Sequence, residues 1–87
     1  MADISVVEID SNTYQVTVAA QSTTMHMVTV QADYAQKLTS GRISHTELIK
    51  KSFEFLLQRE SNSSILRSFD LSVINRYFPE FEREIKA

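Results

Sequence analysis

The sequence predicts a small α+β protein in which an antiparallel sheet is followed by helices. Apolar residues recur with a period of two before Gln31 and with a helical period after it. Clusters of turn-forming residues divide the first part into short pieces. The length of 87 residues fits one domain, so we expect residues 1–87 to fold as a single unit.

The N-terminal part is predicted to form three strands, at about residues 4–9, 14–20 and 24–30. Short polar turns at residues 10–13 and 21–23 join them, which favours an antiparallel meander. In the third strand His26 and Val28 alternate with Met25 and Met27. One polar face per strand predicts a sheet that is covered on one side only.

Three to four helices are predicted after the sheet, at about residues 33–38, 45–60, 65–69 and 71–86. Ser44 and Glu47 have the spacing of a capping box, so we expect the long helix to begin there. Asp70 is a good N-cap for the last helix. Pro79 removes one backbone donor within that helix, which predicts either a kink or a fresh helix start.

Residues 45–60 are apolar around roughly 200° of the helix, where a helix covering one side of a core needs about 100°. This helix is therefore expected to be buried on two sides, the second being a partner or the N-terminal sheet. Arg59 falls inside the apolar arc. Either its charged end reaches solvent at the helix C-terminus, or it forms a structural ion pair with Asp70.

The composition argues against catalysis and against bound cofactors. There is no cysteine and there are two histidines, so neither disulfides nor a histidine/cysteine zinc site is expected. Gly41 is the only glycine, which disfavours a phosphate-binding loop. His26 is expected in the sheet as a hydrogen-bonded core or edge residue, and His45 is expected to be exposed. No nucleophile and base can be paired, so an enzyme is only a remote alternative.

The charge and hydropathy of the chain disfavour nucleic acids and membranes as partners. The net charge is −2, and the nine basic residues lie between Lys37 and Lys86 without a dense block. No apolar run is long enough to span a membrane, and no signal peptide is visible, which predicts a cytoplasmic protein of bacterial type. A chain of this size buries only a small core, which gives it little stability. Oligomerisation commonly supplies the missing stability, so we expect a homodimer.

Two resemblances extend this interpretation. Residues 52–60, 64–71 and 76–80 resemble a small family of uncharacterised bacterial proteins, which implies a short α+β fold and no assigned activity. Residues 27–53 resemble a ribbon-helix-helix DNA-binding unit, which pairs one strand with its dimer mate and places this ribbon in the major groove. This second resemblance requires a free edge on the 24–30 strand.

The ribbon-helix-helix resemblance implies a set of DNA contacts, namely Met27, Thr29, Gln31, Ser44 and His45. The ribbon has no arginine or lysine to read guanine, and two further strands precede it. DNA-binding regulation is therefore the alternative function. The leading hypothesis is a non-catalytic protein that acts by association, as a homodimer or a partner-binding accessory module. Its candidate interface residues are Phe55, Leu57, Tyr77, Phe78 and Phe81.

Overall fold

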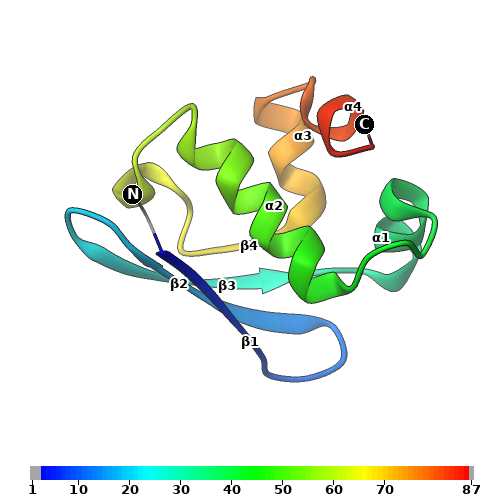
Figure 1. The fold of residues 1–87 in the computed structure, drawn as a ribbon, viewed down its shortest axis with the longest axis horizontal. Helices are drawn as coiled ribbons and strands as arrows, with labels where there is room; N and C mark the ends of the chain where they lie inside the picture. The colour runs from blue at the N-terminus through cyan, green and yellow to red at the C-terminus, as the bar shows by residue number, and fades with distance from the viewer. Residues whose placement is uncertain (1–2, 87) are drawn as a thin grey trace.

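The computed structural model describes residues 3–86 and has the predicted α+β class, with all helices on one face of a four-stranded sheet (Figure 1). Its elements in chain order are β1 (Asp3–Glu8), β2 (Thr13–Ala19), β3 (Thr23–Thr29), α1 (Ala32–Thr39), α2 (His45–Leu57), a 3₁₀ turn (Asn62–Ser64), β4 (Ser68–Asp70), a second 3₁₀ turn (Leu71–Val73), α3 (Ile74–Tyr77) and α4 (Phe81–Lys86). None of the helices within residues 3–86 has the length and apolar character that crossing a bilayer needs.

The predicted three-stranded meander is confirmed. β1, β2 and β3 pair antiparallel, and Val6, Val16 and His26 lie opposite one another across them. The Asp10 carboxylate accepts the amides of Asn12 and Thr13, each at 2.9 Å, and so closes the first turn. These hydrogen bonds, led by the one from Asn12, hold the pKa of Asp10 below its ordinary value. The alternate residues of β2 and β3 point at the helices and are buried.

The segment 65–69, predicted as a short helix, is not helical. The chain makes a 3₁₀ turn at Asn62–Ser64 and then runs into β4, which pairs parallel with β3. A five-residue helix would gain few hydrogen bonds, whereas an extended segment satisfies the edge of β3. The pairing of Phe69 with Val28 also turns the Phe69 ring into the core, where it is buried.

The long helix α2 is buried on two sides, as predicted, although it ends at Leu57 rather than at residue 60. Its Ser44 cap accepts the Glu47 amide at 3.1 Å. On the sheet side the Phe53 ring lies 5.3 Å from the His26 ring. On the other side the Phe55 ring lies 5.2 Å from the Phe81 ring in α4. The chain itself therefore covers both sides of α2, and this burial requires no external partner.

The predicted C-terminal helix at 71–86 is divided into three short pieces. Asp70 caps the first of them, since its carboxylate accepts the Ser72 amide at 3.0 Å. α3 ends at Tyr77, and Phe78 leaves the helical region with φ −132° and ψ 86°. α4 begins just after Pro79, so the proline marks a fresh helix and not a kink.

A buried hydrogen-bond network fastens segment 62–66 to β3. The side-chain amide of Asn62 donates to the Thr24 hydroxyl at 3.1 Å, and this hydroxyl lies 2.8 Å from Nε2 of His26. His26 Nδ1 lies 2.7 Å from the Leu66 carbonyl oxygen. Because a carbonyl only accepts, Nδ1 carries the proton and Nε2 accepts from Thr24. The prediction that His26 is a hydrogen-bonded core residue is confirmed.

Candidate functional site

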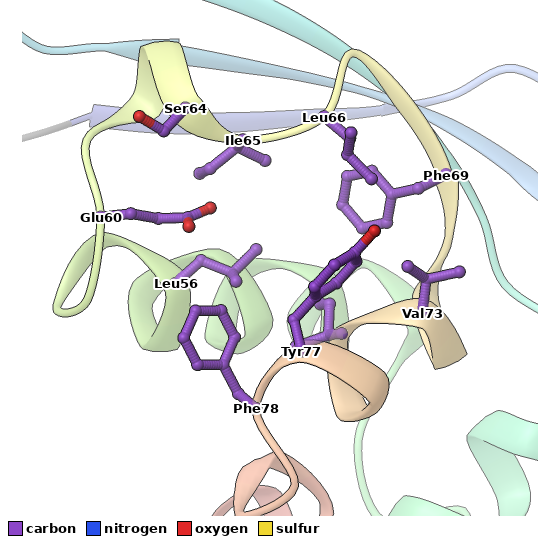
Figure 2. A pocket seen from close by; sticks show the side chains of 10 residues that line it. Leu56, Glu60, Ser64, Ile65, Leu66, Phe69, Val73, Tyr77 and Phe78 are labelled. Atoms are coloured by element: carbon purple, nitrogen blue, oxygen red, sulfur yellow. The ribbon is translucent and has the colours of Figure 1, made fainter.

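An apolar pocket opens between the C-terminal end of α2, segment 60–69 and α3 (Figure 2). Its volume is about 360 Å³, within the range of pockets that hold small ligands or partner side chains. The lining residues are Leu56, Glu60, Ser64, Ile65, Leu66, Phe69, Val73, Ile74, Tyr77 and Phe78. Eight of these ten residues are apolar or aromatic, so the pocket favours an apolar occupant.

The pocket has a buried floor and an exposed apolar rim. Ile65 and Ile74 are buried beneath it, whereas Leu66 is 48% exposed and Tyr77 is 67% exposed. Figure 2 shows the Tyr77 ring and the Leu66 side chain on one side of the opening. An exposed aromatic next to a well-packed apolar floor is typical of anchor points in protein interfaces.

The local sequence explains why α3 and the residue after it contribute three side chains to the lining of the apolar pocket. Ile74, Tyr77 and Phe78 have the i, i+3, i+4 spacing that places side chains on one helix face. The Phe78 ring packs edge-on against Phe55 with the centroids 6.0 Å apart, which fixes α3 against α2. The short 71–78 segment is thereby held in position although it has few helical hydrogen bonds of its own.

Glu60 is the one charged residue among the described residues that line the pocket. Its carboxylate points into the opening between Leu56 and Ile65 (Figure 2). Within residues 3–86 the ion pairs join Lys37 to Glu82 and Arg59 to the two acids Glu80 and Glu84; none involves Glu60. A carboxylate at the wall of an apolar pocket attracts a cation, because the low-dielectric surroundings screen the charge less than water does.

The five predicted interface residues have different environments. Tyr77 and Phe78 line the apolar pocket, so these two candidates are part of the site. Phe55 and Phe81 are buried in the core and pack on each other, which leaves neither available to a partner. Leu57 is partly buried at a separate hollow beside β1.

The predicted ion pair between Arg59 and Asp70 is wrong. The Arg59 guanidinium instead donates to Glu84 at 2.9 Å and to Glu80 at 3.3 Å, and it lies 3.6 Å above the Phe55 ring. It also donates to the Phe55 carbonyl oxygen at 3.1 Å. Asp70 is occupied by its capping bonds to Ser72. Arg59 therefore fastens α2 to α4 and does not reach β4.

Glu80 shows one electrostatic consequence of this arrangement. Its pKa lies below its ordinary value, mainly through a backbone hydrogen bond and further through the Arg59 guanidinium. The carboxylate consequently stays ionised, and able to pair with Arg59, to a lower pH than an ordinary glutamate.

The strand edge that the DNA-binding alternative requires is occupied. β3 pairs with β2 on one side and, at Met27 and Thr29, with β4 on the other. The Met27 amide also donates to the Arg67 carbonyl oxygen at 2.8 Å. A dimer mate therefore finds no free ribbon at Met27–Thr29, since β4 holds that position.

Of the remaining DNA-contact candidates, Ser44 and His45 make local structural contacts, and Gln31 is exposed. Ser44 caps α2, and Nδ1 of His45 lies 3.1 Å from the Tyr14 hydroxyl. His45, predicted to be exposed, is therefore partly buried. Burial, with smaller effects of Glu8 and Asp10, raises the pKa of Tyr14. Gln31 lies exposed before α1.

Several pocket residues were missed by sequence reasoning. The sequence predicts Ile65 and Leu66 in a short helix and Glu60 at the end of the helix at residues 45–60. The available signal was the pair of apolar residues that follows the serine-rich turn at residues 61–64. A continuous pocket could not be recognised without knowing that this turn folds back beside α3.

Comparison of the chain with family models, with curated proteins and with solved structures gives no significant match. The two resemblances seen in the sequence therefore stay predictions. Within residues 3–86, no group of three or more histidine, cysteine, aspartate or glutamate side chains gathers as a metal site would require.

Proposed function

We propose that the protein is a non-catalytic binding module whose apolar pocket receives a side chain of a protein partner. The observation that carries the proposal is the pocket itself, with its buried floor and the exposed Leu66 and Tyr77 at its rim. Removing these two side chains from water on association would contribute favourably, at about 25 cal/mol per Å² of apolar surface.

The chemistry of the pocket also indicates what the partner presents. An aromatic or aliphatic side chain fits the walls formed by Leu56, Ile65 and Phe69. A lysine or arginine beside that anchor would reach the Glu60 carboxylate. The partner segment proposed here therefore combines one large apolar residue with a neighbouring cation.

A pair of small probes tests this chemistry directly. Phenethylammonium and 3-phenylpropionate share an aromatic ring and carry opposite charges. Titrated up to about 10 mM against the isotopically labelled protein, phenethylammonium is expected to bind several-fold more tightly and to shift the methyl signals of Leu56, Ile65 and Ile74. The measurement is the change of NMR chemical shifts with probe concentration.

Two variants serve as the comparison. Glu60→Gln is expected to abolish the preference for the cation while the ring still binds. Glu54→Gln removes an exposed carboxylate from α2 outside the pocket and is expected to leave the preference intact. Shifts scattered over the surface, or an equal response to both probes in the unmodified protein, would contradict the proposed site.

The free edge of β1 supports a second candidate, self-association of two copies. β1 is the terminal strand of the sheet and contains neither lysine nor proline, the residues that commonly protect an edge. Val7 on this strand is 57% exposed. Beside the strand lies a hollow lined by Ile4, Leu57, Lys50 and Glu54 among others. A two-fold interface repeats the same surface, so Lys50 of one copy can face Glu54 of the other.

Light scattering after size-exclusion chromatography tests this candidate. The protein is expected to form a dimer that dissociates on dilution, and Val7→Lys is expected to shift it to the monomer because a lysine blunts the edge. Met25→Lys is the matched control, since Met25 is 52% exposed on β3, away from the edge. A monomer at every concentration would exclude self-association and leave the pocket proposal untouched.

A further inference from the structure

A further hollow lies at the end of the helical layer opposite to the apolar pocket, where α1 and α4 are side by side (Figure 1). Its volume is about 420 Å³, and its surroundings are more polar than those of the apolar pocket. The residues that line it are Lys37, Leu38, Thr39, Ser40, Arg42, Ile43, Lys51, Ile85 and Lys86. We call it the basic hollow.

The charge of the basic hollow is one-sided. Lys37, Arg42, Lys51 and Lys86 are four of the nine basic residues in the sequence, and among residues 3–86 no acidic residue lines the hollow. Of these four, only Lys37 has an ion pair within residues 3–86, with Glu82 at a long 3.8 Å. These four positive charges gather in one place although the net charge of the chain is −2. A cleft lined by one sign of charge focuses its field and raises the local concentration of counter-ions.

Helix ends account for only part of this cluster. Lys37 lies in the last turn of α1 and Lys86 in the last turn of α4, where the helix dipole favours a cation. Arg42 lies in the loop after α1, and Lys51 lies in the middle of α2. Neither position gains from a helix C-terminus, and all four side chains are exposed where they line the hollow.

The loop between α1 and α2 brings Arg42 into place. The chain reverses through left-handed backbone at Ser40 (φ 53°) and Gly41 (φ 73°). The Arg42 amide then donates to the Thr39 carbonyl oxygen at 3.0 Å, which closes the turn. The loop is thereby compact and places Arg42 beside Lys37 and Lys51 around the hollow.

We propose that the basic hollow binds the di- or triphosphate group of a small ligand. A guanidinium binds two phosphate oxygens at once, and the three ammonium groups supply point charges around it. Four converging cations match a chain of linked phosphates better than a single monoanion. The partly buried Ile43 and Ile85 provide an apolar surface for the remainder of the ligand.

Calorimetric titration with inorganic pyrophosphate and with tripolyphosphate, at about 0.15 M salt, tests the proposal. Both are expected to bind with one-to-one stoichiometry, and sulfate at least ten-fold more weakly. Arg42→Ala and Lys51→Ala are each expected to weaken binding of pyrophosphate about ten-fold, as loss of a charged hydrogen-bond donor does. A thermal melt of each variant verifies that it is folded.

The matched controls are Arg67→Ala and Arg76→Ala, which change the net charge equally but remove exposed arginines outside the hollow. They are expected to leave pyrophosphate affinity within about two-fold of the unmodified protein. Equal losses in both sets of variants, or no saturable binding, would overturn the proposal. A short DNA duplex or an acidic peptide that binds more tightly than tripolyphosphate through Arg42 and Lys51 would also overturn it, in favour of that macromolecule.

Discussion

Asn62 is the residue on which the connection between segment 62–66 and the sheet depends most. Its side-chain amide donates to the Ser22 carbonyl oxygen at 2.9 Å and to the Thr24 hydroxyl at 3.1 Å, and it is buried. Through Thr24 it is also linked to His26. This buried amide therefore joins segment 62–66 both to the turn at Ser22 and to β3 at Thr24.

Replacement of Asn62 by alanine is expected to lower the free energy of unfolding by about 1–3 kcal/mol, because buried acceptors lose their donor. Urea unfolding followed by circular dichroism measures this change. Asn12→Ala, in an exposed turn, is the control and is expected to cost much less. A loss below about 0.5 kcal/mol for Asn62→Ala would mean that the network is not a structural link.

The sequence could place His26 in the core but could not name its partners. Strand alternation alone puts His26 on the same face as Val28. Its acceptor, the Leu66 carbonyl oxygen, is 40 residues away along the chain. The predicted ion pair of Arg59 with Asp70 was wrong for the same reason. The sequence places Arg59 in the apolar arc of the helix, but whether it pairs with Asp70 or with Glu80 and Glu84 depends on how the last helices pack.

Among the elements, β1 to β3 could be predicted from the sequence, whereas β4 and the short helices after it could be predicted only in part. Alternation and polar turns define β1 to β3 locally. β4 has three residues, and it is extended because β3 offers an unpaired edge and the core accepts Phe69. This is a tertiary preference that no local pattern contains. The wide apolar arc of α2 correctly indicated two buried sides, and both covers belong to the same chain.

α1 and α4 are joined by a hydrogen bond that should make stability depend on pH. The Tyr34 hydroxyl donates to Glu82 at 2.9 Å. Burial, reinforced by Glu82, raises the pKa of Tyr34 well above its ordinary value of 10.0. Below pH 10 both folded and unfolded chains keep this proton, so the contribution to stability is constant.

Above pH 10 the unfolded chain ionises at Tyr34 while the folded chain does not, and folding stability is expected to fall as the pH rises. Tyr34→Phe removes this ionisation, so its unfolding midpoint should decline less steeply between pH 10 and about pH 11.5. Thermal melts over that range measure the slope. Tyr77→Phe, at an exposed tyrosine, should retain the steeper slope; identical slopes for all three proteins would contradict the account.

At the scale of the whole molecule, the sheet supports the helical layer, and the apolar pocket and the basic hollow of this layer have opposite chemistry. The apolar pocket lies where α2 and α3 meet, and the basic hollow lies where α1 and α4 meet. The fold class was predictable because it follows from local periodicity. The hollows were not, since each combines residues from segments that only the packing of the short C-terminal helices brings together.

Association of the protein with a partner through the apolar pocket is the proposed function. Selection of a random peptide library on the intact protein tests it most directly. Selected peptides should share one large apolar residue with an adjacent lysine or arginine. They should lose binding to the double variant Leu66→Ser/Tyr77→Ser and keep it for the control Val7→Ser/Met25→Ser, whose residues are also about half exposed or more. Peptides without this pattern, or peptides that bind both double variants equally, would contradict the claim.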